Sequence, residues 1–174
     1  MIFFTSDQHF GHSNIIKYCE RPFASADEMD EQLIANWNAT VGPHDVVWML
    51  GDISFHSSSL TREILRELNG SLKLVMGNHD HRFKNDKAVL DCFTEVYECF
   101  VTRTYPRDNC ETAPFVLCHF PFLEWDKKYN GAIHLHGHSH GKSPVEEKFY
   151  RYDVGVDTND FRPISLKEIF AKFS

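Results

Sequence analysis

The sequence predicts an α/β layered fold that begins with a largely parallel sheet. In the first half of the chain, short apolar runs alternate with amphipathic segments, which is the pattern of strands joined by helical crossovers. In the second half, strand-like segments follow one another closely and indicate antiparallel pairing. The chain has 174 residues, 42% of them hydrophobic, which suits a single domain with a sizeable core. We therefore expect one domain over residues 1–174.

Five apolar runs predict buried strands, because polar or turn-forming residues bound each of them. They cover residues 2–4, 46–50, 72–76, 115–118 and 132–135. An antiparallel pair is expected at 95–105 and 113–118 around a turn at 106–109, with a further strand near 152–156. Since parallel strands end at one edge of a sheet, the residues that follow these runs are expected to converge.

Capping residues and apolar stripes predict the helices between and after these strands. Ser25–Glu28 has the form of a capping box, Ser59 is expected to cap a second helix that ends at Asn69-Gly70, and Ser165 with Glu168 opens the last helix. A further helix is expected over 84–93. The apolar stripes behind the three caps are Met29, Leu33, Ile34 and Trp37; Leu60, Ile64, Leu65 and Leu68; and Leu166, Ile169, Phe170 and Phe173.

Composition narrows the possible functions. The formal charge of −7 argues against a broad basic surface, so tight non-specific binding to duplex nucleic acid is not expected. No apolar run approaches the roughly 18 residues of a membrane-spanning helix, and Met1–Phe4 lacks the features of a signal peptide. The five cysteines have irregular spacing and form no C-x-x-C pair, so we expect reduced thiols in a cytoplasmic protein without a membrane partner.

Residue types that bind metals follow the apolar runs, and the chain has eleven histidines. Their carboxylate, imidazole and amide groups suit Mn²⁺, Zn²⁺, Fe or Ni²⁺. Taken singly, each motif could be a turn or a polar loop, whereas together, each after a strand, they indicate a metal site. A carboxylate such as Asp52 can bridge two cations that activate water and hold phosphoryl oxygens. The residues in question are Asp7, His9, Asp52, Asn78, His79, His119, His138 and His140.

The order of these motifs resembles the signature of the calcineurin-like metallophosphoesterase superfamily. D-x-H occurs at Asp7–His9, G-D at Gly51-Asp52, G-N-H-D at Gly77–Asp80, a single histidine at His119 and G-H-x-H at Gly137–His140. Residues 3–23 also resemble a compact bacterial and phage branch of this superfamily. The resemblance implies one α/β domain of two packed mixed β-sheets flanked by helices, in a four-layer α/β/β/α arrangement. No acidic residue follows Asp52 three positions later, which departs from the usual pattern at a position that is not normally a ligand.

Carried over by position, the resemblance implies two divalent metal ions with Asp52 between them. Water activated between these metals would attack phosphorus in line. His79 would protonate the leaving alkoxide, and Asp80 would orient its imidazole. The first metal would be held by Asp7, His9, Asp52 and His140, and the second by Asp52, Asn78, His119 and His138.

The functional prediction is a dinuclear-metal-dependent phosphoester hydrolase acting on a small nucleotide or another phosphodiester, with Mn²⁺ as the activating metal. The short stretch between His79 and His119 leaves no room for a large cap domain, which favours diesters. His12, Asn14 and Arg21 are expected to reach the substrate, because their loop follows His9.

Two alternatives stay open on the sequence, and a third is disfavoured. A phosphomonoesterase would have the same fold and ligands. A non-enzymatic metal-binding interaction scaffold would keep the fold, although the complete ligand set together with His79 argues for hydrolysis. Amidohydrolases also use H-x-H pairs, but they need a barrel of about 250 residues with the pair near its start. This chain has only 174 residues and its pair, His138 and His140, lies late in the sequence, which argues against an amidohydrolase. The sequence carries no prediction of oligomeric state.

Overall fold

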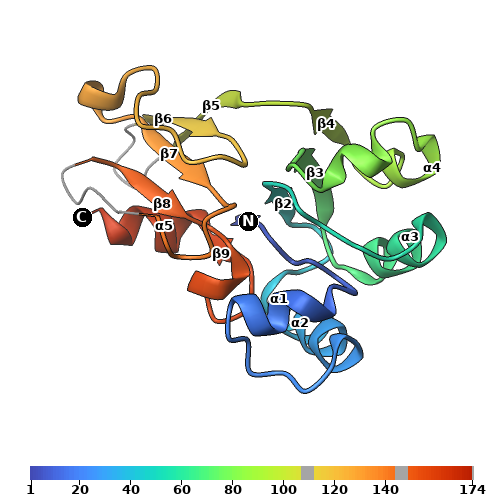
Figure 1. The fold of residues 1–174 in the computed structure, drawn as a ribbon. Coiled ribbons are helices and arrows are strands. Elements are labelled where there is room, and N and C mark those ends of the chain that lie inside the picture. Colours follow the sequence, from blue (N-terminus) through green and yellow to red (C-terminus); the bar gives the residue numbers. More distant parts are fainter. Residues whose placement is uncertain (107–111, 144–148, 174) are drawn as a thin grey trace.

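The computed structural model describes residues 1–106, 112–143 and 149–173, which form two mixed β-sheets flanked by helices (Figure 1). The predicted α/β class is therefore confirmed. Of the turn predicted at 106–109, residues 107–109 lie outside the described residues, as does Cys110. Among the described residues, no helix has the length and apolar character that crossing a bilayer demands.

The first sheet has five strands in the order β4-β3-β2-β1-β9. Strands β1 to β4 are parallel, with Phe3 opposite Val47 and Val47 opposite Leu72, while β9 is antiparallel to β1. The parallel beginning predicted from the alternating pattern is confirmed, and its strands end at one edge of the sheet. The strand bounds are β1 Ile2–Thr5, β2 Val46–Met49, β3 Ser71–Val75, β4 Glu95–Tyr97 and β9 Ile164–Ser165.

The second sheet has four strands in the order β5-β6-β7-β8. Strand β5 is antiparallel to β6, as the closely spaced segments predict, whereas β6, β7 and β8 are parallel. The single strand predicted over 95–105 is wrong, because the exposed residues 98–100 carry the chain from β4 in the first sheet to β5 in the second. The strand bounds are β5 Val101–Pro106, β6 Thr112–Leu117, β7 Ile133–His136 and β8 Arg151–Asp153.

Helices α2 (Ala26–Thr40), α3 (Ser58–Glu67) and α4 (Lys87–Leu90) pack against one face of the first sheet. Ser25 caps α2 as predicted, its hydroxyl accepting a hydrogen bond from the Glu28 N–H at 3.1 Å. Helix α3 is capped by Ser57 and not by Ser59. Its predicted stripe is wrong at Leu60, which is 40% exposed, because Thr61 takes the buried position on that turn.

The remaining helical segments are short. Helix α4 is shorter than the predicted 84–93, because the 3-10 turn η1 (Asp80–Phe83) and a cap at Asp86 occupy the residues before it. Helix α1 (Ser13–Tyr18) was not predicted, since only Ile15 of its six residues is buried. Helix α5 (Leu166–Lys172) begins with the predicted capping box of Ser165 and Glu168. Two further 3-10 turns are η2 (Lys128–Asn130) and η3 (Val156–Thr158).

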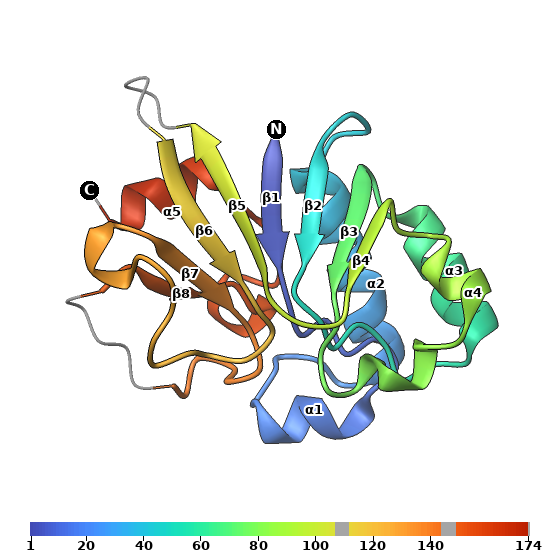
Figure 2. The same cartoon turned by 90° about the horizontal axis from the view of Figure 1, so that it is seen from above.

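Two apolar cores join the layers. Alternate residues of a strand face opposite sides of a sheet, so Phe3 and Val47 pack with the helices while Phe4 and Trp48 pack toward the second sheet. Helix α5 borders this second core, where the ring of Phe170 meets that of Phe115 at 5.6 Å. In Figure 2 the carboxyl ends of β1 and β2 point toward α1. The loops at this edge therefore extend from strands that are fixed on both faces.

Candidate metal centre

The structure brings the predicted metal-binding residues to one edge of the two sheets. Direct backbone hydrogen bonds join their loops, since the Asp7 N–H donates to the Gly51 carbonyl at 3.0 Å and the Gly137 N–H donates to the His119 carbonyl at 3.0 Å. The convergence predicted from the strand pattern is therefore confirmed. By element, the residues are Asp7 and His9 after β1, Asp52 after β2, Asn78 and His79 after β3, His119 after β6, and His138 and His140 after β7.

Three groups of side chains among the described residues place their donor atoms close enough to share a cation. Two of them consist of predicted ligands, and the third, Cys19, His140 and Asp157, shares His140 with one of these two. The donor atoms of each group lie within 4.8 Å of one another. The first group is Asp7, His9 and His140, and the second is Asp52, His119 and His138. Asn78 extends the second group, because its Oδ1 lies 3.0 Å from His119 Nε2.

The carboxylate of Asp52 lies between the two groups. Its Oδ2 is 3.7 Å from Nε2 of His9 and 3.5 Å from Nε2 of His119. Its Oδ1 accepts a hydrogen bond from the backbone N–H of His79 at 2.9 Å, which fixes the orientation of the carboxylate. One oxygen of Asp52 therefore faces donor atoms from both groups.

The backbone at these ligand positions is unusual. The five predicted ligands Asp7, His9, Asp52, His138 and His140 have φ values of 60°, 54°, 57°, 68° and 47°. Residues other than glycine rarely adopt this left-handed backbone conformation, and each such residue costs of order 1–3 kcal/mol of conformational strain. Strain of this kind persists where the surrounding structure holds it and concentrates at functional sites. The strained backbone is therefore a second observation, besides the clustered donor atoms, that marks this edge as a candidate functional site.

Glycines next to the ligands let the loops approach one another closely. Gly51 has φ +92°, and a Cβ there would collide with the backbone of Gly77. A Cβ at Gly77 would in turn collide with the Asp52 carboxylate. The glycines of the G-D and G-N-H-D motifs are therefore required by close packing between the two loops.

Hydrogen bonds behind the ligands orient the imidazole rings. His119 Nδ1 lies 2.7 Å from the Leu50 carbonyl oxygen, and His140 Nδ1 lies 2.7 Å from Asp157 Oδ2. In a neutral ring, an Nδ1–H that donates in this way leaves the lone pair on Nε2, which is the atom that would bind a metal. The sequence interpretation missed Asp157, although it follows β8 just as the predicted ligands follow their strands.

The donor set fits a bound cation. Asp7 Oδ1 and His9 Nε2 are buried without a hydrogen-bond partner among the described residues, and they lie 3.8 Å apart. An unpaired buried polar atom is costly, so two such atoms facing one another indicate a missing partner that both can bind. Carboxylate oxygen with imidazole nitrogen is a donor combination of Mn²⁺, Zn²⁺ and related metals.

Burial and charge shift the pKa values of the candidate ligands in different directions. Burial lowers the pKa of His9 to about 2, so its imidazole is neutral, which is the form that binds metals. Burial raises the pKa of Asp7 to about 7, although the nearby His119 and His140 oppose this shift. Burial alone would raise the pKa of Asp52, yet the hydrogen bond and charge of His119 lower it. The site therefore carries a carboxylate charge that a cation would neutralise.

His79 faces the cavity next to Asp52, with its Nε2 3.9 Å from Asp52 Oδ2 and its side chain 45% exposed. The predicted role of Asp80 in orienting this imidazole is wrong. The Asp80 carboxylate is fully buried and accepts hydrogen bonds from the backbone N–H groups of Asp52, Ile53 and Gly77 at 2.7–2.9 Å. Asp80 is therefore a positioning residue that fixes the G-D loop against the G-N-H-D loop.

Arg21 is not in a position to bind substrate, which corrects the sequence prediction. Its guanidinium is buried and pairs with both oxygens of Asp157 at 2.7 Å. It also donates to the carbonyl oxygens of Asp7 at 2.7 Å and Gln8 at 2.9 Å. Arg21 thus connects the D-x-H loop to the carboxylate that holds His140.

Replacing Arg21 with methionine is expected to destabilise the protein by about 3–5 kcal/mol, because the buried Asp157 charge loses its bidentate guanidinium partner and keeps only His140. Urea denaturation of the metal-free protein, followed by circular dichroism, measures this loss. The control is Lys17→Met, which removes an exposed cation from α1 and is expected to change stability by no more than about 0.5 kcal/mol. Equal stability of the two variants would show that the buried ion pair is not needed.

A cavity of about 450 Å³ opens beside the candidate metal centre. His12 lines it, stacks on Phe55 with ring centroids 3.9 Å apart, and has its Nδ1 3.3 Å from His9 Nδ1. The structure therefore places His12 at the cavity, and its contact with a substrate stays a prediction. Asn14 is exposed on α1 and is not among the residues that line this cavity.

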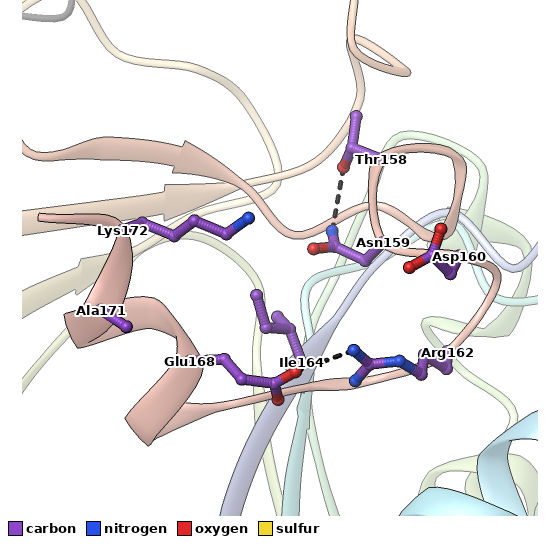
Figure 3. Close-up of a pocket in the computed structure, with 8 residues that line it drawn as sticks. All are labelled: Thr158, Asn159, Asp160, Arg162, Ile164, Glu168, Ala171 and Lys172. Atoms are coloured by element: carbon purple, nitrogen blue, oxygen red, sulfur yellow. Dashed lines mark hydrogen bonds and ion pairs between the residues drawn. The ribbon is translucent and has the colours of Figure 1, made fainter.

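A second cavity, of about 370 Å³, lies away from the ligand residues, between η3 and helix α5 (Figure 3). Arg162 and Glu168 form an ion pair at 2.8 Å across part of it, and Lys172 borders its other side. Because Glu168 also belongs to the capping box of α5, this pair serves to hold the helix start. The cavity shares no residue with the candidate metal centre.

No protein-family model matches the chain. The chain is 34% identical over 172 residues to the uncharacterized protein MJ1445 of Methanocaldococcus jannaschii, and the match covers 95% of this chain and 86% of that protein. The Gene 66 protein of Mycobacterium phage D29 is 34% identical over 163 residues, covering 81% of this chain and 79% of the phage protein. The solved structure of the protein of unknown function AQ665 from Aquifex aeolicus has a TM-score of 0.73 and 25% identity, covering 98% of both chains.

The fold and the clustered side chains define an α/β protein with two mixed sheets and a candidate metal centre where their strands end. The chain belongs to the family of the Methanocaldococcus jannaschii protein MJ1445, with which it shares most of its length.

Proposed function

We propose that the protein is a dinuclear-metal-dependent phosphoester hydrolase of the calcineurin-like metallophosphoesterase type. The observation that carries the proposal is the position of Asp52 Oδ2, between His9 Nε2 at 3.7 Å and His119 Nε2 at 3.5 Å. These imidazoles belong to two separate groups of candidate ligands. A carboxylate shared by two such groups is what a two-cation site requires.

Both metal positions use residues that the structure brings together. Two divalent cations bound there would supply Lewis acidity, lowering the pKa of water toward neutrality and neutralising phosphoryl charge. We propose Mn²⁺ as the activating metal, with Zn²⁺, Fe and Ni²⁺ also suited to these donors. The assigned ligands are Asp7, His9, Asp52 and His140 for one cation, and Asp52, Asn78, His119 and His138 for the other.

His79 is the proposed proton donor to the leaving group. Its side chain lines the cavity and is 45% exposed, so it can reach an alkoxide oxygen of a bound ester. An imidazole can give up a proton near neutral pH, which suits this step. Asp80 holds the backbone of the same loop in place through its three hydrogen bonds.

An open site favours phosphodiesters, small nucleotides among them, over monoesters. Asn78, His79 and His138 are all exposed at the mouth of the site. In the described part of the chain, the segment between His79 and His119 forms η1, α4 and strands β4 to β6, which leaves no larger element there to close over the substrate. Such a site has room for a second substituent on phosphorus.

Two finer points belong to the same proposal. We propose the four-layer α/β/β/α architecture of the superfamily, supported by helices α2 to α4 on the first sheet and by α5 beside the second core. We also propose a cytoplasmic location. It is supported by the free thiols of Cys19, Cys92, Cys99 and Cys118, because disulfides are rare in reducing compartments.

The test is hydrolysis of bis-p-nitrophenyl phosphate and p-nitrophenyl phosphate by metal-free protein to which Mn²⁺ is added. We expect hydrolysis with Mn²⁺, faster turnover of the diester, and loss of activity when a chelator removes the metal. A faster monoester reaction would identify a phosphomonoesterase of this fold. If neither ester is hydrolysed with Mn²⁺, Zn²⁺, Fe²⁺ or Ni²⁺, the enzymatic proposal is wrong and an interaction scaffold is the better explanation.

A further inference from the structure

The cavity beside the candidate metal centre has two unlike halves. One half is formed by the ligand residues, and the other by Ile15, Tyr18, Phe55 and Lys142. Its volume of about 450 Å³ lies in the range of about 300–1,000 Å³ that small-ligand pockets have. The ligand half would hold a phosphoryl group, so the second half is left for another part of the substrate.

Aromatic rings dominate this second half. Phe55 stacks on His12 with an interplanar angle of 19°, and Tyr18 stands edge-on to His12, with ring centroids 6.5 Å apart at 77°. Tyr18 is 64% exposed, so its ring is open to the cavity. Any of the nucleobases can stack on such a ring, because every base has a π-face.

Lys142 adds a positive charge on the same side. Its ammonium donates a hydrogen bond to the Tyr18 carbonyl oxygen at 2.9 Å, which connects the loop after His140 to the end of α1. An ammonium carries three N–H donors. Lys142 can therefore also donate to a sugar or phosphate oxygen while it remains held at the cavity.

We propose that Tyr18, Phe55 and Lys142 form a subsite for the nucleoside of a nucleotide phosphodiester. The base would lie against Tyr18, and Lys142 would contact the sugar or a phosphate oxygen. This inference rests on the proposed phosphoesterase function. A simple alkyl phosphodiester would leave the aromatic half of the cavity empty, and the net charge of −7 disfavours a long duplex, so a single nucleotide unit is the occupant that both halves fit.

The test compares two diesters with the same p-nitrophenolate leaving group, the p-nitrophenyl ester of thymidine 5′-phosphate and ethyl p-nitrophenyl phosphate. In the Mn²⁺-loaded protein, kcat/KM for the thymidine ester is expected to exceed that for the ethyl ester by about 10-fold or more, the effect that base stacking provides. Tyr18→Ala is expected to lower this ratio by about 10-fold, and Tyr18→Phe is expected to keep most of it. The matched control is Tyr129→Ala, which removes a 73% exposed ring that does not line this cavity and should leave the ratio unchanged.

A binding measurement separates this inference from the proposed function. Isothermal titration calorimetry of the Mn²⁺-loaded protein is expected to show tighter binding of thymidine 5′-monophosphate than of inorganic phosphate, with the difference lost in Tyr18→Ala. If both diesters are hydrolysed at equal kcat/KM and both ligands bind equally, the nucleoside subsite is wrong while the phosphoesterase function stands. If neither ester is hydrolysed but the Tyr18-dependent preference in binding persists, the subsite is supported and the phosphoesterase function is wrong.

Discussion

Replacing Asp52 with asparagine is expected to weaken both metal positions together and to abolish most of the hydrolytic activity. Asp52 Oδ2 is the oxygen that faces His9 of one ligand group and His119 of the other. The asparagine amide has nearly the same shape as the aspartate carboxylate but carries no charge. It would therefore not neutralise the positive charge of either cation. Losing a group that only supports a metal ligand costs about 10- to 100-fold, and we expect the loss of this shared ligand to lower kcat/KM by at least about 100-fold.

Elemental analysis of the purified variant after dialysis against Mn²⁺ measures the number of metals retained. The matched control is Asp30→Asn, which alters a buried carboxylate that pairs with His56 at 2.6 Å outside the ligand groups. This control is expected to keep the wild-type metal content. If Asp52→Asn lost only one of two metals, Asp52 would belong to a single position and the bridging assignment would be wrong.

Replacing His79 with alanine is expected to leave both metals bound and to slow the hydrolysis of esters with poor leaving groups by about 100- to 10,000-fold. The imidazole of His79 is absent from both groups of candidate ligands, and the contact that its residue makes with Asp52 Oδ1 comes from the backbone N–H, which alanine keeps. A p-nitrophenolate leaving group needs little protonation, so the defect should be much smaller for p-nitrophenyl esters. The measurement is the dependence of kcat/KM on the pKa of the leaving group.

His44→Ala is the matched control, since His44 is an exposed histidine before β2 and distant from the site in the chain. It is expected to show the wild-type dependence on the leaving group. A His79→Ala variant that lost metal would show instead that His79 is a ligand. An equal defect for good and poor leaving groups would rule out a role as proton donor.

Much of the fold could be predicted because its signals are local. Apolar runs such as 46–50 and 72–76 are long enough for a strand and stop at polar residues, so β2 and β3 were placed correctly. Helices α2 and α5 carry their own caps at Ser25 and Ser165. The edge where parallel strands end follows from these elements alone, which is why the sequence predicts that the residues of the candidate metal centre lie together.

The parts that could not be predicted depend on contacts between distant segments. Arg21 and Asp157 are separated by 136 positions, so no local sequence pattern indicates that the Arg21 guanidinium forms an ion pair with Asp157. The role of Asp80 depends on the backbone of Asp52 and Ile53, which reaches it only through packing of two loops. Helix α1 has a single buried residue, and such a short segment gives no apolar stripe.

The proposed nucleoside subsite also depends on contacts between segments that are distant in the sequence. Tyr18 and Lys142 are far apart in the sequence and come together because the loop after His140 crosses to the end of α1. Neither residue carries a motif, and an exposed tyrosine or lysine is ordinary on a protein surface. Only their common position at the cavity beside the ligand groups gives them a functional meaning.

Anomalous diffraction from crystals of this protein soaked in Mn²⁺ tests the central claim most directly. The account predicts two strong peaks about 3.5–4 Å apart, one beside Asp7, His9 and His140, the other beside His119 and His138, with Asp52 contacting both. A single peak, or Mn²⁺ bound only away from these side chains, would contradict the assignment of a two-metal centre.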